Sequence, residues 1–313
     1  MSRQPVDKRI SALRRFAVSI TAFTVLGAFF LHFEESWAQP VVALVCCYAF
    51  ELLLETLEAY GTGRSPRYRG GLRAFVDFLL PAHITGLSIA LLLYPNARLG
   101  PIVFACAVAQ GSKVLLRAPI AGRWRHFLNP SNAGIAATLL LFPWVGISPP
   151  YQFTEGVTGI WGAGVLGWAL PVAVLVSGTA INVMLTGKWP LIIGWLGGFV
   201  LQAVLRAVAF GTPLAAPLLP LTGLVFVLFT NYMITDPGTT PVSRRNQVAF
   251  GAATALVYGL LVSMHVVFGL FFALVIVCAL RGLALYALAA ASALRALRAH
   301  RALEAPRVEV ARV

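Results

Sequence analysis

Residues 72–94 read LRAFVDFLLPAHITGLSIALLLY, an apolar stretch with a proline and a histidine near its middle. A helix of about 20 predominantly apolar residues is long enough to cross a bilayer. The rest of the chain has the same character: of 313 residues, 59% are hydrophobic and only 11% are charged. Soluble domains carry about 25% charged residues. The composition therefore excludes a soluble enzyme, a disordered chain and a nucleic-acid-binding domain, and it predicts an all-α polytopic membrane protein.

Hydropathy along the chain predicts about ten transmembrane helices. Residues 1–290 are expected to form a single transmembrane domain, with halves at 1–145 and 146–290. Residues 291–313 are expected to form a basic cytoplasmic tail, either helical on anionic lipid or solvated. The ten expected helices are 13–33, 37–59, 72–94, 98–117, 130–147, 160–185, 189–209, 214–235, 246–263 and 266–288.

The positive charges support this count. The net charge is +13, and with the N-terminus inside, all 24 Lys and Arg except Arg98 and Arg206 fall on the inner side. Such an asymmetry is what the positive-inside rule describes. We therefore expect a bacterial inner (plasma) membrane protein with both termini cytoplasmic. Charges that lie between apolar runs suit lipid headgroups rather than nucleic acid.

A short repeat indicates internal symmetry. Thr85-Gly86-Leu87 in the third expected helix recurs as Thr222-Gly223-Leu224 in the eighth, which runs the opposite way. Helices five apart and opposite in direction are typical of two inverted five-helix repeats, and the crossing of such helices is a common binding site. Close helix packing through small residues is the alternative interpretation.

His83 lies two residues after Pro81, near the middle of its helix. A proline-broken helix with a mid-depth histidine predicts a ligand or cofactor site. A core histidine hydrogen-bonded to a neighbouring helix is the alternative. In the eighth helix, Asn231 and Tyr232 are deep enough to line the same pocket. No metal site is expected, because the other membrane histidines, His32 and His265, lie at the outer edge.

Three polar clusters lie toward the inner ends of helices. Glu51, Glu55 and Glu58 form one helical stripe, which predicts either an ion-pair network with the basic loop that follows or a cation entrance. Lys113 and Arg117 end the fourth helix, and Asn129-Pro130-Ser131-Asn132 begins the fifth.

The second of these clusters has two interpretations. Asn129 is a good N-cap and Pro130 suits the first helical position. A helix N-terminus near basic residues favours an anion, so Lys113, Arg117, Asn129 and Asn132 are expected to hold an anionic group. Capping together with lipid headgroup contact is the alternative.

The third cluster is a polar turn. Asp236-Pro237-Gly238 is a turn signal, and Arg244 and Arg245 follow closely enough to pair with Asp236. The four cysteines, Cys46, Cys47, Cys106 and Cys278, all lie in apolar runs and are interpreted as buried core thiols. No soluble-enzyme motif accompanies them.

Several of these segments carry a resemblance. They are Gly111-Ser112-Lys113-Val114-Leu115-Leu116-Arg117, Asn129-Pro130-Ser131-Asn132-Ala133-Gly134, Leu221-Thr222-Gly223 and Thr235-Asp236-Pro237-Gly238-Thr239-Thr240-Pro241. In order and spacing, residues 72–290 resemble membrane subunits B and D of the sodium-translocating NADH:quinone reductase and Rnf electron-transport complexes. Closer still is the enediyne-biosynthesis-associated UnbU type of membrane protein. Its likeness rests on Arg125-His126-Phe127-Leu128-Asn129 and on His265-Val266-Val267-Phe268-Gly269-Leu270-Phe271-Phe272, among other runs.

The resemblance implies ten helices in two inverted halves and a flavin. In those subunits FMN is esterified to a threonine in a Ser/Thr-Gly-Ala-Thr sequence. The comparable loop here, 143–160, lacks the Ala-Thr pair, which disfavours covalent FMN. The resemblance leaves a non-covalent flavin (FMN or riboflavin) or a quinone, and the cofactor-binding residues would be His83, Thr85, Gly86, Thr222, Gly223 and Asn231.

Three functional hypotheses follow. The first is a redox membrane protein that exchanges electrons with a partner protein and supports enediyne-type natural product biosynthesis, with the cofactor supplying the chemistry. The second is a channel or transporter for a small solute or natural product on the same inverted-repeat scaffold. The third is a membrane anchor for another enzyme.

Overall fold

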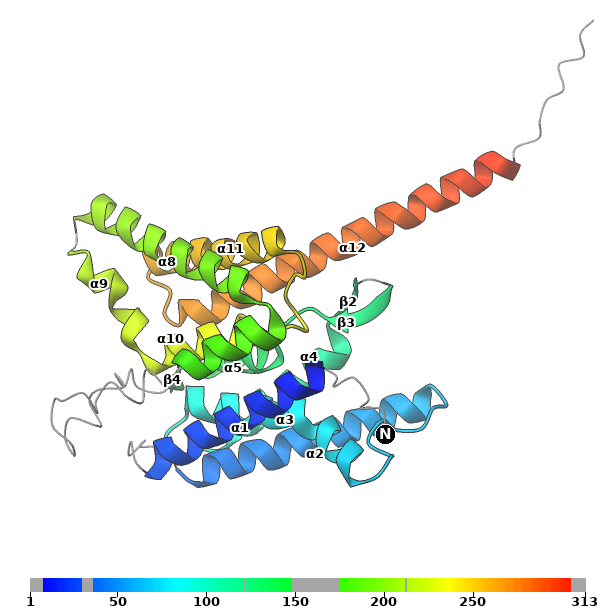
Figure 1. Cartoon of the computed structure of the whole chain (residues 1–313), viewed down its shortest axis with the longest axis horizontal. Coiled ribbons are helices and arrows are strands. Elements are labelled where there is room, and N and C mark those ends of the chain that lie inside the picture. The colour runs from blue at the N-terminus through cyan, green and yellow to red at the C-terminus, as the bar shows by residue number, and fades with distance from the viewer. Residues whose placement is uncertain (1–7, 30–35, 121, 148–174, 212, 305–313) are drawn as a thin grey trace, which may run out of the picture.

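The structure is a computed structural model, and it describes residues 8–29, 36–120, 122–147, 175–211 and 213–304. Long helices lie side by side, and two short antiparallel strand pairs join their ends (Figure 1). α1, α2 and α3 lie on one side of the molecule and α8, α11 and α12 on the other, with α5 between α3 and α12. The described fold is therefore all-α in its main elements, as the composition predicts.

The first half forms the expected helices. They are α1 (Lys8–Phe29), α2 (Ala38–Gly61), α3 (Leu72–Leu92), α4 (Gly100–Leu115) and α5 (Pro130–Leu141). α3 continues through Pro81 without a break. α5 is shorter than predicted because Pro143 follows it, and residues 146–147 instead form β4 (Gly146–Ile147), paired with β1 (Leu93–Tyr94). Strands β2 (Arg117–Ile120) and β3 (Arg123–His126) make a hairpin between α4 and α5.

The second half departs further from the prediction. Its long helices are α8 (Trp189–Phe210), α11 (Arg244–Ser263) and α12 (Gly269–Glu304). Helical residues 175–181 precede a π-helical turn, Asn182–Thr186, whereas most of the expected helix 160–185 lies outside the described residues.

The expected single helix 214–235 is wrong. It is divided into α9 (Ala215–Leu218), a 3₁₀ turn (Leu219–Thr222), α10 (Leu224–Leu228) and a π-helical turn (Phe229–Met233). Pro217 and Pro220 have no backbone N–H to donate, and Gly223 is extended (φ −86°, ψ 143°), so a continuous α-helix cannot form there.

Six helices in the described residues are long and apolar enough to cross a membrane, and the chain is a multi-pass membrane protein. Two shorter apolar helices, Gly100–Leu115 and Leu175–Thr186, accompany them. Ten continuous spans are therefore not what the described part contains: α5 has 12 residues and the 214–235 segment is broken. The six spans are Ile10–Phe29, Ala38–Gly61, Leu72–Leu92, Trp189–Phe210, Arg244–Ser263 and Gly269–Arg298.

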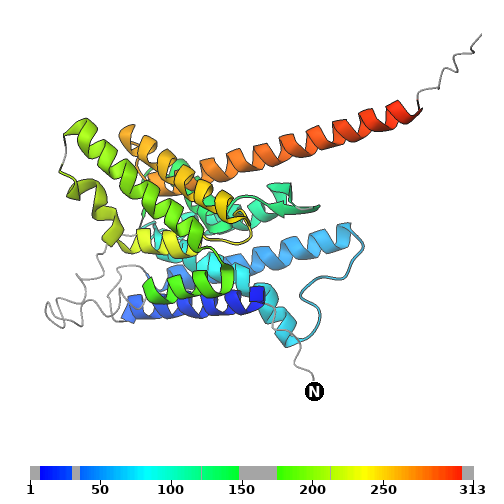
Figure 2. The same cartoon turned by 45° about the horizontal axis from the view of Figure 1, so that its top comes forward.

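The last helix also differs from the expectation. Residues 266–288 were predicted as the final span and 291–313 as a separate tail, but α12 is one helix of 36 residues. It runs straight past the body of the molecule (Figures 1 and 2). Its outer part is rich in Ala, Leu and Arg, which are strong helix formers, and contains no proline. The described tail continues the axis of the final span and does not bend aside as a second segment.

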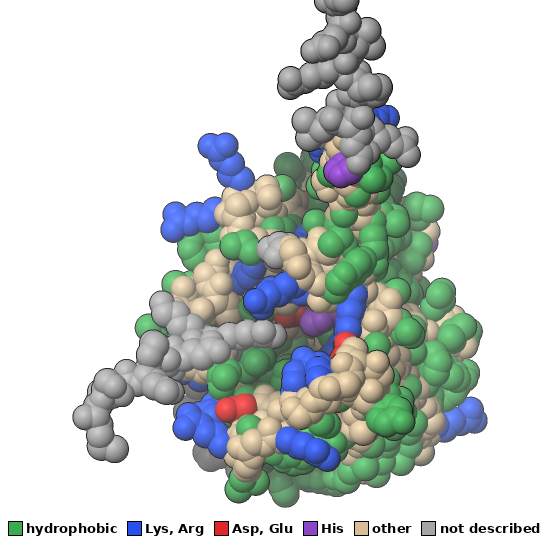
Figure 3. All heavy atoms as spheres, turned by 90° about the vertical axis from the view of Figure 1, so that its right-hand side faces the viewer, with side chains coloured by type: hydrophobic (Ala, Val, Ile, Leu, Met, Phe, Trp, Pro, Cys, Tyr) green, Lys and Arg blue, Asp and Glu red, His purple; other side chains and the backbone are tan. Residues whose placement is uncertain are grey.

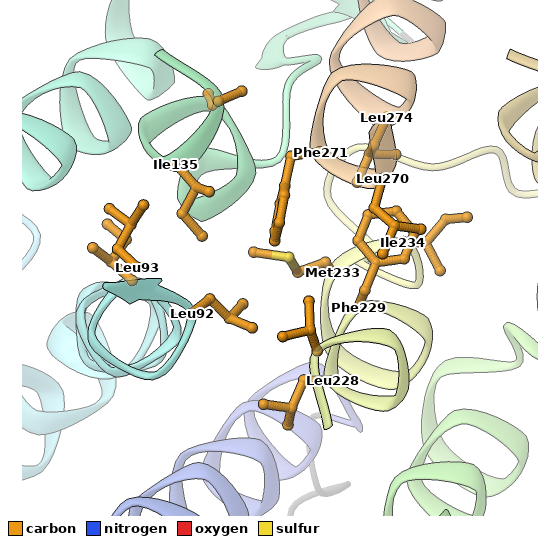
Figure 4. Packing of buried hydrophobic residues seen from close by; sticks show 14 of the residues in the cluster. Leu92, Leu93, Ile135, Leu228, Phe229, Met233, Ile234, Leu270, Phe271 and Leu274 are labelled. Atoms are coloured by element: carbon orange, nitrogen blue, oxygen red, sulfur yellow. The ribbon is translucent and has the colours of Figure 1, made fainter. Parts of the chain in front are cut away.

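Both halves share one apolar core. Leu92 of α3, Ile135 of α5, Phe229 and Met233 of the π-helical turn and Phe271 of α12 are all fully buried. Figure 4 shows Phe271 and Met233 pointing toward one another between α5 and the 228–234 segment. The irregular segment is therefore enclosed by protein, as irregular backbone inside a bilayer must be.

Glycines bring helix backbones into direct contact. A Cβ added to Gly194 of α8 would lie 2.3 Å from the carbonyl oxygen of Val248 in α11, and one added to Gly251 would lie 2.4 Å from the Leu191 carbonyl oxygen. Gly197, on the same helix as Gly194, has no atom within 4 Å of such a Cβ. Gly194 and Gly251 are therefore positions of close contact between α8 and α11, whereas Gly197 is not.

We predict that Gly194→Ala destabilises the protein and Gly197→Ala does not. Both changes gain the same helix propensity, so their difference isolates the overpacking, which typically costs about 1–3 kcal/mol. Thermal denaturation of both variants in detergent measures this difference. Equal midpoints would contradict the close approach of α8 and α11.

Candidate functional site

His83 joins three helices. Its Nδ1 lies 2.6 Å from the Tyr48 hydroxyl of α2, and its Nε2 lies 2.8 Å from the Thr21 hydroxyl of α1. Thr21 donates its own hydroxyl proton to the Ala17 carbonyl oxygen at 2.8 Å, so it accepts from His83 Nε2–H. Nδ1 then accepts from the Tyr48 hydroxyl, which fixes a neutral tautomer. This is the geometry of the hydrogen-bonded core histidine that the sequence left as the alternative.

The other predicted cofactor residues of α3 face their own neighbours. Thr85 donates to the Pro81 carbonyl oxygen at 2.8 Å within its own helix. A Cβ added to Gly86 would lie 3.0 Å from the Ala43 carbonyl oxygen, so Gly86 packs against α2. Thr222 ends the 3₁₀ turn, and its side chain lies outside the described residues. Gly223 contributes extended backbone after it.

The acidic stripe on α2 forms ion pairs, and the predicted pairing with the basic loop is found at Glu55 and Glu58. Glu51 accepts from Lys113 Nζ at 2.8 Å, and Glu58 accepts from Arg117 at 2.5 Å. Glu55, buried to 3% exposure, accepts from Arg64, from Arg67 and from the Arg67 backbone N–H. Lys113 and Arg117, which were expected to hold an external anion, therefore each pair with a carboxylate of α2 instead.

These charges lie at one end of the molecule. Figure 3 faces the end from which α12 projects, and Lys and Arg side chains gather there, with Asp and Glu side chains among them. The C-terminal end of α2 and the β2–β3 hairpin lie at the same end (Figure 1). Tyr286 of α12 donates its hydroxyl to the Arg117 carbonyl oxygen and ties the last helix to this network.

A second polar group forms a junction deeper in the protein. Asn129 caps α5 as predicted: its side-chain oxygen accepts from the Asn132 N–H at 2.9 Å. The Asn129 amide also donates to the Met233 carbonyl oxygen at 3.2 Å, and the Asn132 amide donates to the Phe271 carbonyl oxygen at 3.0 Å. Two side chains of the α5 N-terminus thus hold the π-helical turn and α12 in place.

Asn231 lies within that π-helical turn and is buried. Its side-chain amide donates to the Val227 carbonyl oxygen at 3.1 Å, and its own carbonyl oxygen accepts from the Asn182 amide at 2.9 Å. Asn132 Oδ1 and Asn231 Oδ1 are buried without a hydrogen-bond partner in the described part of the chain. The two predicted residues therefore each keep an acceptor for a ligand or a water.

The turn 236–241 is held by cations that the sequence analysis did not single out. Asp236 accepts from the Gly238 N–H at 2.9 Å and from the Thr239 hydroxyl at 3.1 Å. Lys188 donates to the Pro241 carbonyl oxygen and Arg281 to the Thr239 carbonyl oxygen, each at 2.7 Å. The signal that would have found Lys188 is an isolated lysine between two apolar runs.

The expected pairing of Asp236 with Arg244 and Arg245 is wrong. No ion pair among the described residues joins them: Asp236 is used within its own turn, and both arginines are exposed at the start of α11. The Arg244 guanidinium instead lies 5.8 Å from the centre of the Trp189 ring. The Asp236 carboxylate is instead used by the Gly238 N–H and the Thr239 hydroxyl, as Asp side chains commonly are within turns.

Comparison with known proteins finds no family model that matches this chain and no curated protein that matches it. The described residues hold no group of three or more His, Cys, Asp or Glu that would bind a metal ion. The arrangement offers two unpartnered amide oxygens, a buried lysine and a half-buried arginine around one irregular segment. The groups around this segment are therefore hydrogen-bond acceptors and cations.

Lys188, which donates to the turn 236–241, is a buried cation with 4% of its surface exposed. Burial lowers its pKa from its usual 10.5 to about 8, while nearby Asp236 opposes the decrease and Arg281 adds to it. Below pH 8 the amine is charged in both the folded and the unfolded chain. Between pH 8 and 10.5 only the unfolded chain binds the proton, so the free energy of unfolding rises with pH across that window.

We predict that the free energy of unfolding rises by at most about 3 kcal/mol between pH 8 and 10.5, and that this rise is absent from Lys188→Met. Denaturation in detergent between pH 7.5 and 10.5, the range that spans the folded and unfolded pKa of Lys188, measures the slope in each protein. Lys113→Met is the matched control, since its amine pairs with Glu51 elsewhere, and it is expected to keep the slope. A slope that survives in Lys188→Met would refute the assignment.

Proposed function

We propose that the chain is a membrane-embedded subunit of the electron-transport type, like subunits B and D of the sodium-translocating NADH:quinone reductase and Rnf complexes. One observation carries the proposal: the second motif segment lies beside the start of the fourth, which is distant in sequence. Asn129 of the second motif bonds Met233, two residues before the fourth motif, and Arg117 of the first bonds Tyr286 of α12.

The proposal includes two inverted halves of five passes each. Contacts support a correspondence between the two halves. α2 packs on α3 and α4, and α8, its equivalent in the second half, packs on the π-helical turn and α11. α4 packs on α5 as α11 packs on α12. Elements in equivalent positions also meet across the halves, since α1 contacts Asn182–Thr186 and α5 contacts α12. Such contacts between equivalent elements are what a two-fold axis in the membrane plane produces.

The flavin slot expected between α3 and residues 214–235 does not fit a flavin. Both ring nitrogens of His83 are used, Thr85 is bonded within its helix, and Gly86 lies against the α2 backbone. Among the predicted cofactor-binding residues whose side chains are described, only Asn231 keeps a side-chain acceptor without a partner. We therefore derive no redox step through this slot, and the cofactor part of the proposal, a non-covalent flavin or a quinone exchanging electrons with a partner protein, rests on the resemblance.

An optical spectrum of the purified native protein tests this proposal. We expect the visible absorbance of an oxidised flavin, bleached by dithionite, or a quinone recovered by solvent extraction and identified by mass spectrometry. Gentle detergent purification keeps a non-covalent cofactor in place. Absence of both would count decisively against an electron-transport role.

A second candidate is a channel or transporter, and the broken second-half element favours it. Discontinuous helices in transporters expose unpaired polar groups to the substrate, and Asn231 Oδ1 and Asn132 Oδ1 are such groups at this break. Amide oxygens would accept hydrogen bonds from a small neutral polar solute. This candidate needs no chromophore and no redox partner.

We predict for this candidate that proteoliposomes swell faster than empty vesicles in glycerol or urea gradients, followed by light scattering. Asn231→Leu removes the acceptor and is expected to slow swelling at least tenfold. Asn246→Leu, an exposed position at the start of α11, is the matched control and is expected to leave the rate unchanged. Equal rates for protein-containing and empty vesicles would exclude transport of these solutes.

A further inference from the structure

A thiol pair lies in the interface between α2 and α4, apart from the junction described above. Cys47 and Cys106 are both fully buried, and their thiols are adjacent. Cys106 Sγ also lies 3.6 Å from the Ala43 carbonyl oxygen, one turn before Cys47. Single buried cysteines behave as small apolar side chains, but here two sulfurs from different helices contact each other.

Gln110 lies one turn after Cys106 and beside Cys47, and it is fully buried. Neither its Oε1 nor its Nε2 has a hydrogen-bond partner within the described residues. An unsatisfied buried polar group costs about 1–3 kcal/mol, and such a group in a native protein marks a missing water, ion or ligand. The unpartnered amide faces the same interface as the two thiols.

Ion pairs between α2 and the α4 end lie between the two thiols and the charged end of the molecule. Moving along α2 and α4 from Cys47 and Gln110, the next contact is the Glu51–Lys113 pair, and Glu58–Arg117 follows. Lys113 Nζ donates to Glu51, which lies one helical turn after Cys47 on α2. Charged groups therefore lead from the charged end of the molecule toward the sulfurs.

We infer that Cys47, Cys106 and Gln110 form a binding site for a soft monovalent metal ion, Cu⁺. Thiolates select soft ions such as Cu⁺, and two sulfurs on facing helices provide the pair of ligands that this ion accepts. Zn²⁺ is disfavoured because it requires about four ligands. Gln110 would donate its amide hydrogens to the sulfurs, the role of an outer partner to a ligand.

The binding step is balanced without any oxidant. Two thiols lose their protons to solvent, two Cu–S bonds form, and no electron is transferred. The product carries one negative charge, which the Gln110 amide and the nearby Lys113 stabilise. The site is independent of the proposed electron-transport function, so either can fail alone.

Metal retention by the purified full-length chain tests the inference. Protein in detergent, kept anaerobic, is supplied with Cu⁺ from its bicinchoninate complex, desalted and analysed for metal content. We expect one Cu⁺ per chain. Cys47→Ser and Cys106→Ser are each expected to weaken binding at least 100-fold, and Gln110→Leu about tenfold with both thiols intact.

Cys46→Ser and Cys278→Ser are the matched controls, because they remove one half-buried and one buried thiol outside the pair. Both are expected to retain the metal. Thermal denaturation of each variant separates misfolding from loss of a ligand, and Gln110→Leu supplies a test that removes no sulfur.

The site would be overturned if the native protein retained no more Cu⁺ per chain than the Cys47→Ser/Cys106→Ser double variant. It would also be overturned if Cys46→Ser lost as much Cu⁺ as Cys47→Ser, or if Gln110→Leu bound Cu⁺ with unchanged affinity. An intact mass two hydrogens lighter, with no metal, would identify a disulfide between the helices instead and would also overturn it.

Discussion

Polar groups buried among apolar helices must find their partners within the chain, and this constraint organises the whole molecule. The π-helical turn Phe229–Met233 illustrates it, because a broken helix leaves carbonyl oxygens unpaired at membrane depth. Asn129 bonds the Met233 carbonyl oxygen and Asn182 bonds that of Asn231. The break is thus stabilised by side chains from both halves, and it lies in the apolar core around Phe271.

The sequence predicts best where one local rule is sufficient. The helix start at Asn129-Pro130 follows from capping preference, and the pairing of Glu55 with the basic loop follows from charge spacing. The pairs Glu51–Lys113 and Glu58–Arg117 were missed because they join α2 to residues about 60 positions away in sequence. The break at 214–235 was missed because Pro217 and Pro220 lie in a segment whose hydropathy alone favours a span. Lys188 was missed because its role depends on Pro241, which is distant in sequence.

His83 shows why a candidate residue cannot be interpreted from its own helix. Proline and mid-depth position make it look available, but its two partners, Tyr48 and Thr21, belong to two other helices. Asn231 presents the opposite case: its side-chain amide is used locally and its side-chain oxygen is left over. Of these two predicted residues, only Asn231 keeps a side-chain acceptor without a partner among the described residues.

The continuous last helix has a mechanical consequence. With 36 residues and a rise of about 1.5 Å per residue, α12 is a rod about 54 Å long. Near its start, the Phe271 carbonyl oxygen bonds Asn132, and further along Arg281 holds the Thr239 carbonyl oxygen. Because α12 is continuous from these contacts to Glu304, a tilt of the helix at the buried contacts also displaces its C-terminal end.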